Sequence, residues 1–130
     1  MHLVCYARKV PTVNTPSPFE LADRYVDESA EHDPAHATSL GIAGFDHAWG
    51  QAFGLEGHAA RMDLVRRYRA AFAAHAAHPD PKQKLAARVM LGSLDEELAA
   101  DAAGEQFRDL AHMVSSFQRV GSTFDLMKKH

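Results

Sequence analysis

The sequence predicts an all-α fold. Alanine, the residue that most favours helix, accounts for 23 of the 130 residues, whereas strand-favouring β-branched residues are few, with eight valines and one isoleucine. No window alternates apolar and polar residues for long enough to indicate a strand. Serine, aspartate and proline also stand together in arrangements typical of helix N-termini. We therefore expect an irregular bundle of five to six helices, with a loop rich in glycine and aromatic residues after the second.

Length, charge and cysteine content limit the class of protein. A chain of 130 residues is enough for one domain with a single hydrophobic core. The formal net charge of −3 argues against a general nucleic-acid binder, which would normally be basic. No apolar run approaches the roughly 18 residues of a membrane span, so we expect no membrane partner. The single cysteine, Cys5, cannot form an internal disulfide, which favours a cytoplasmic location.

The domain is expected to begin at a helix cap. Residues 1–16 show no helical period and are predicted to be a poorly ordered leader, followed by a helical domain over residues 17–130. Ser17 precedes a proline and is followed three residues later by Glu20, which predicts a capping box. The helix that starts there should end near His32, because a proline two residues later disfavours helical geometry at the residue before it.

A short helix and an irregular loop are expected next. Asp33 and Pro34 predict a second helix start, and Gly41 is expected to close that helix. Five glycines from Gly41 to Gly57, interspersed with aromatic residues, then predict an irregular loop whose aromatic side chains reach the core.

Two long helices and two short ones complete the predicted fold. The first runs from about His58 to Ala77, and the second is capped by Asp80 and ends near Gly104. The side chains expected to face the core are, in the first, Met62, Val65, Tyr68, Phe72 and Ala76 and, in the second, Leu85, Ala86, Val89, Leu94 and Leu98. The two short pieces carry Phe107, Leu110 and Met113, and Val120, Phe124 and Met127.

Nine histidines suggest a metal site, but their spacing supports one weakly. His75 and His78 lie three residues apart with Asp80 nearby, whereas a structural zinc site uses four ligands and this set offers three at most. Solvated histidines are the simpler interpretation. The common zinc hydrolases also need a His-Glu pair on a helix, and the chain contains no His-Glu dipeptide. We therefore assign no catalytic, cofactor-binding or metal-binding residue.

The aromatic loop is the most distinctive candidate for a binding site. Phe45, Trp49 and Phe53 lie among glycines and could line a small pocket. The alternative is that these side chains pack under the loop as a satellite core, the commoner behaviour of large aromatic residues. The acidic residues from Asp95 to Asp101, and the arginines at positions 66, 67 and 69, are interpreted as solvated helix faces, with Asp63 paired to Arg67.

Several segments resemble the bacterial DUF885 family of domains of unknown function. Residues 19–28 read FELADRYVDE and residues 32–46 read HDPAHATSLGIAGFD, of which the stretch from Asp33 to Gly41 is the most specific piece. Shorter similarities are EGHAAR at 56–61, DAAGEQFRDL at 101–110 and FDLM at 124–127. The resemblance covers nearly the whole chain from Phe19 to Met127.

This resemblance implies a noncatalytic N-terminal helical segment of a longer protein, either a fragment or a truncated form. Family members look like largely helical zinc metallopeptidases, whose metal-binding helix carries His-Glu followed by Pro-Gly-His-His, downstream of the matching region. Zinc is therefore expected for the full-length family, with no cofactor in this chain. We expect such a segment to pack against the missing catalytic body or to self-associate, through a stripe comprising Phe107, Leu110, Phe124 and Met127.

Two other classes of function stay open. One is a self-contained helical module that binds a small molecule or a protein. The other is a hydrolase with an unrecognised site, in which His75, His78 and Asp80 surround a metal ion.

Overall fold

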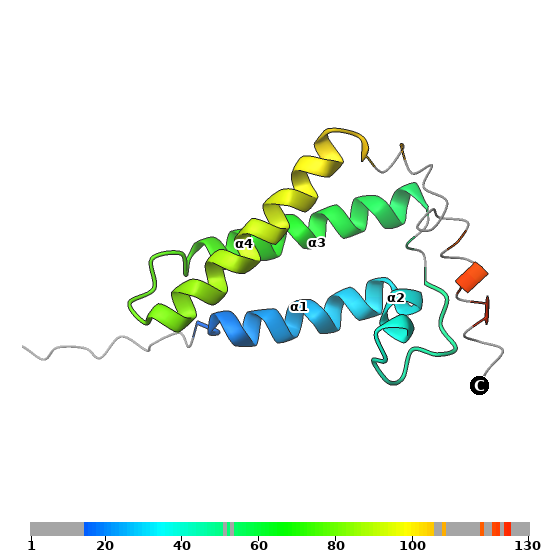
Figure 1. Cartoon of the computed structure of the whole chain (residues 1–130), viewed down its shortest axis with the longest axis horizontal. Helices are drawn as coiled ribbons and strands as arrows, with labels where there is room; N and C mark the ends of the chain where they lie inside the picture. The colour runs from blue at the N-terminus through cyan, green and yellow to red at the C-terminus, as the bar shows by residue number, and fades with distance from the viewer. Residues whose placement is uncertain are drawn as a thin grey trace, which may run out of the picture.

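The all-α prediction is confirmed in the part of the chain that the structure describes. The computed structural model describes residues 15–50, 52, 54–105, 108, 118, 121–122 and 124–125, and it contains no strand there. Its helices are α1 (Pro18–His32), α2 (Pro34–Ser39), α3 (Leu55–Ala73) and α4 (Pro81–Ala102) (Figure 1). The leader and the last two predicted helices fall largely outside the described residues, so both stay predictions.

The first two helices begin at the caps that the sequence predicts. The Ser17 hydroxyl accepts a hydrogen bond from the Glu20 backbone N–H at 3.3 Å, and the Glu20 carboxylate accepts one from the Ser17 N–H at 2.7 Å. This capping box satisfies N–H groups that the start of α1 would otherwise leave unpaired. Asp33 separates α1 from α2, and its carboxylate accepts a hydrogen bond from the His36 N–H at 3.0 Å. Local sequence therefore determines where α1 ends and α2 begins.

The third helix differs from its prediction at both ends. It begins at Leu55 instead of His58, so Gly57, the expected end of the loop, is buried in the first turn of α3. It ends at Ala73 instead of Ala77, because the His75 N–H donates to the Phe72 carbonyl and tightens the chain into a turn. The described residues between α2 and α3 form turns, not helix.

The core lies between α1 and an antiparallel hairpin of α3 and α4 (Figure 1). Tyr68 of α3 is 5% exposed and meets the edge of the Tyr25 ring of α1, with ring centroids 5.2 Å apart. The predicted inward stripe of α3 is confirmed from Met62 to Phe72. The side chains with almost no exposed surface in the hairpin are Val65, Phe72, Ala87 and Leu94.

Two of the predicted inward side chains of α4 face outward. Leu85 is 63% exposed and Val89 is 62% exposed, whereas Ala87 and Leu94 are buried. The physical reason is that apolar residues surround this helix on most sides, so more than one stripe fits helical spacing. In α1, Leu21 is buried, whereas the large apolar side chain of Phe19 is 53% exposed.

Candidate binding site

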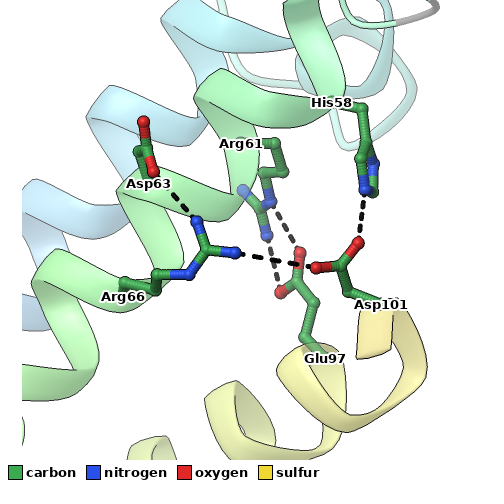
Figure 2. A network of polar contacts seen from close by, with 6 residues as sticks. All are labelled: His58, Arg61, Asp63, Arg66, Glu97 and Asp101. Carbon is green, nitrogen blue, oxygen red and sulfur yellow. Dashed lines mark hydrogen bonds and ion pairs between the residues drawn. The ribbon is translucent and has the colours of Figure 1, made fainter. Parts of the chain in front are cut away.

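A cavity of about 600 Å³ lies where α1, α2, α3 and α4 approach one another. Its walls are mainly apolar and come from all four helices and the turns after α2, with Val26, Ala30, Ala37, Ile42, Met62 and Ala100 among them. Part of its polar lining comes from the junction of α1 and α2, with His32, Asp33 and His36. A second polar group lies at the start of α3 and the end of α4, where His58, Arg61, Glu97 and Asp101 face one another across the hairpin (Figure 2). The cavity thus combines an apolar wall with a compact polar patch.

Arg61 is the centre of this polar patch. Its guanidinium donates to both oxygens of the Glu97 carboxylate, from Nε at 2.8 Å and from Nη2 at 3.1 Å. The same group donates to the Ser29 hydroxyl at 3.0 Å and to the Tyr25 hydroxyl at 2.7 Å, both on α1. Four hydrogen bonds to one side chain therefore tie α1, α3 and α4 together, and the bidentate pair with Glu97 holds the guanidinium in one plane.

Arg61 and Tyr25 are partly buried, and burial together with their hydrogen-bond partners shifts the pKa values of both side chains. Burial acts to lower the pKa of Arg61, but the hydrogen bonds and the negative charge of Glu97 outweigh it and raise the pKa above its usual value. Burial raises the pKa of Tyr25, and the nearby positive charge of Arg61 opposes that rise in part. Arg61 therefore stays charged and Tyr25 stays protonated around neutral pH.

His58 and Asp101 form a second pair beside Arg61. The His58 Nε2 atom lies 2.6 Å from Oδ1 of Asp101, and the side chains are 32% and 21% exposed. The other oxygen of Asp101 lies 3.7 Å from Nη2 of Arg66, whose Nη1 atom is 2.9 Å from the Asp63 carboxylate (Figure 2). The carboxylate orients the imidazole toward α4, so the pair presents hydrogen-bonding groups to a ligand at a defined place.

A second polar cluster joins α1 to α3 outside this cavity. The Tyr68 hydroxyl donates to the Glu28 carboxylate at 2.6 Å, and Arg67 donates to the other Glu28 oxygen at 2.6 Å. The hydrogen bond from Tyr68 leads the causes that hold the pKa of Glu28 below its usual value. Burial and the Glu28 carboxylate raise the pKa of Tyr68 to about 12. This cluster stabilises the packing of α1 on α3.

Two of the three aromatic residues predicted to line a pocket are described, and both lie away from this cavity. Phe45 and Trp49 are half-buried in the segment between α2 and α3, and neither is among the described residues that line the cavity. The Trp49 ring lies 5.1 Å from the Phe124 ring, centroid to centroid. Phe53 lies outside the described residues. A pocket formed by these aromatic residues stays a prediction.

The histidines considered for a metal site lie at the turn between α3 and α4. His75 is buried, and its ring centroid lies 6.0 Å from that of His78. The His78 Nδ1 atom accepts a hydrogen bond from the Asp80 N–H at 3.1 Å, while the Asp80 carboxylate caps α4. No group of three or more potential metal ligands is found among the described residues.

Spacing in the sequence does not predict the polar patch, because it places two of the acidic residues of the patch on a solvated helix face. Glu97 and Asp101 are half-buried and face Arg61 and Arg66 of α3, so that interpretation is wrong for both. The sequence does contain a signal: His58 and Arg61 are three residues apart, and Glu97 and Asp101 are four apart. In an antiparallel hairpin the start of one helix meets the end of the other, which brings these complementary pairs into register.

In comparisons with known proteins, no family model, no curated protein and no solved structure matches this chain. Among the described helices, none combines the length and the apolar character that a bilayer crossing requires. The cavity and its polar patch are therefore the features that indicate a function.

Proposed function

We propose that this chain is a helical binding module that takes a small amphipathic organic molecule into the cavity between helices α1 to α4. The observation that carries the proposal is the cavity itself, whose volume of about 600 Å³ is in the range of small-molecule sites. Such sites combine mostly apolar walls with a few converging polar groups, as this cavity does. The apolar body of the ligand would contact residues such as Val26 and Met62, and its polar end would reach the patch around Arg61.

The polar end is expected to carry no net charge. Arg61 already faces Glu97, and Asp101 already contacts both His58 and Arg66, so the charged groups of the patch have partners within the chain. A charged ligand group would lose its hydration without gaining an unpaired counter-charge. A hydroxyl or an amide would instead exchange hydrogen bonds with the patch at lower cost.

Binding of the uncharged fluorescent probe N-phenyl-1-naphthylamine tests this proposal. Ala100 and its neighbour Ala99 are both exposed, but only Ala100 is among the described residues that line the cavity. Ala100→Leu should reduce the affinity for the probe by about tenfold, because the larger side chain occupies volume that the probe needs. Ala99→Leu is the matched control, and its affinity should stay within about twofold of the parent.

Two results would contradict the proposal. One is the absence of saturable binding by the probe. The other is an equal loss of affinity in the two leucine variants, which would place the bound probe outside the cavity. Circular dichroism of both variants verifies that each remains helical.

A second candidate function is the one that the family resemblance implies, a noncatalytic segment that packs on a larger helical body. The exposed apolar side chains of Leu40 and Leu55, 63% and 76% exposed, favour it because such surfaces are usually covered by a partner. Its test is the DNA that follows the codon for His130. An open frame that encodes His-Glu followed by Pro-Gly-His-His supports it, and unrelated sequence there argues against it.

A further inference from the structure

The outward side of α4 carries two large apolar side chains that no described element covers. Leu85 and Val89 lie one helical turn apart and are 63% and 62% exposed. The side of α4 that packs on α1 and α3 is a different one, where Ala87 and Leu94 are buried. We use the term α4 outer face for the surface formed by Lys82, Leu85, Val89, Gly92 and Glu96.

A glycine on this face has no explanation within the described chain. A methyl group placed on Gly92 would meet no described atom within 4 Å apart from the neighbouring backbone of its own helix, so no close contact with another described element requires glycine there. Glycine in the middle of a helix lowers stability relative to alanine. What glycine does allow is the close approach of another backbone. Gly92 follows Val89 by three residues and so lies beside it on the same face.

The charges of α4 are separated along its length. Every charged residue between Pro81 and Leu94 is basic, and every charged residue from Asp95 to Asp101 is acidic. On the α4 outer face this separation leaves Lys82 toward one end and Glu96 toward the other. Within the described part of the chain, the ion pairs of the structure involve neither of these two side chains.

Two copies of this charge pattern complement each other when the two helices run in opposite directions. Val89 lies midway between Lys82 and Glu96 in the sequence. If two copies of α4 pack antiparallel about a two-fold axis at Val89, Lys82 of each copy faces Glu96 of the other. A parallel arrangement in register would instead oppose like charges. The same axis brings the apolar pair of one copy against the glycine-containing side of the other.

We propose that the α4 outer face is the interface of a symmetric homodimer, in which two α4 helices pack antiparallel about Val89. Leu85 and Val89 supply the apolar contact, Gly92 lets the helices approach, and Lys82 and Glu96 set their direction. This interface is separate from the cavity and does not depend on ligand binding there.

Sedimentation equilibrium of the full chain tests the dimer. The average mass should rise with concentration from 14.3 kDa toward twice that value, and added salt should weaken the association. Val89→Asp should remain at the monomer mass, with unchanged helical circular dichroism because the position is exposed. The matched control is Leu55→Asp on α3, another exposed apolar position, which should associate like the parent.

Charge reversal tests the antiparallel direction. Lys82→Glu and Glu96→Lys should each weaken the association constant by about tenfold, because each change creates two like-charge contacts in a symmetric dimer. The double variant restores opposite charges and should recover to within about threefold of the parent. A parent chain that stays monomeric up to about 1 mM overturns the proposal. The proposal is also overturned if Val89→Asp associates as strongly as the parent. It is overturned as well if the double variant has a smaller association constant than either single variant.

Discussion

At the scale of single residues, Arg61 connects more elements than any other side chain of the candidate site described here. Its four hydrogen bonds reach α1 and α4 from α3, and its ion pair with Glu97 is partly buried. Removing one partner of such a pair leaves the other charge without compensation, which costs more than the pair itself contributes.

Arg61→Met should therefore destabilise the fold by about 2 kcal/mol, measured as the free energy of unfolding in urea. The double variant Arg61→Met with Glu97→Leu should recover part of that loss, because no uncompensated carboxylate remains. A double variant whose loss equals the sum of the two single losses would show that the two side chains do not interact.

Tyr68 gives a prediction at high pH. Its folded pKa of about 12 exceeds its ordinary value of 10.0, so the folded state keeps a proton that the unfolded chain releases. The stabilisation from this group is complete below pH 10 and is lost as the pH rises toward 12. The free energy of unfolding should fall over this window, and the fall should be smaller in Tyr68→Phe. Parallel pH profiles of the two proteins would contradict the assignment.

The ion pairs of the arginines in α3 show that local sequence spacing does not predict which acidic residue each arginine contacts. Spacing predicts an ion pair between Asp63 and Arg67, which is wrong. Asp63 pairs with Arg66, and Arg67 pairs with Glu28 of α1 at 2.6 Å. The partner from another helix competes with the one in the same helix, and only tertiary packing places that partner nearby.

At the scale of elements, helix starts could be predicted well because their signals are local. Ser17, Asp33 and Asp80 all act as the predicted caps, each through a hydrogen bond from a backbone N–H to its side chain. The rotation of α4 about its axis could not be predicted, because its apolar residues fit more than one helical stripe. Packing of Ala87 and Leu94 on α3 resolves that ambiguity.

The cap of α4 can be tested by substitution. The Asp80 carboxylate accepts hydrogen bonds from the N–H groups of Lys82 and Gln83 at 2.8 and 3.4 Å. Asp80→Ala should cost about 1 kcal/mol in the free energy of unfolding, whereas Asp80→Asn, which can still accept these bonds, should cost a few tenths at most, ~0.3 kcal/mol. Equal losses in both variants would mean that the negative charge, not the hydrogen bonds, stabilises this helix start.

At the scale of the whole molecule, the candidate site depends on the antiparallel arrangement of α3 and α4. His58 and Asp101 are 43 positions apart in the sequence, and they meet because the turn after α3 reverses the chain. The sequence predicts both helices and the break between them, but not that their charged ends form one wall of a cavity. Residues from α1 and α2 complete that cavity, which no single segment indicates.

The most direct test of the central claim is mapping of amide chemical shifts by NMR during titration with N-phenyl-1-naphthylamine. If the cavity binds the probe, the largest shifts fall on residues that line it, such as Ser29, Ala37 and Ala100. Shifts concentrated instead at Trp49 or at Val89 would contradict the claim, because they would place binding in the aromatic loop or on the outer face of α4.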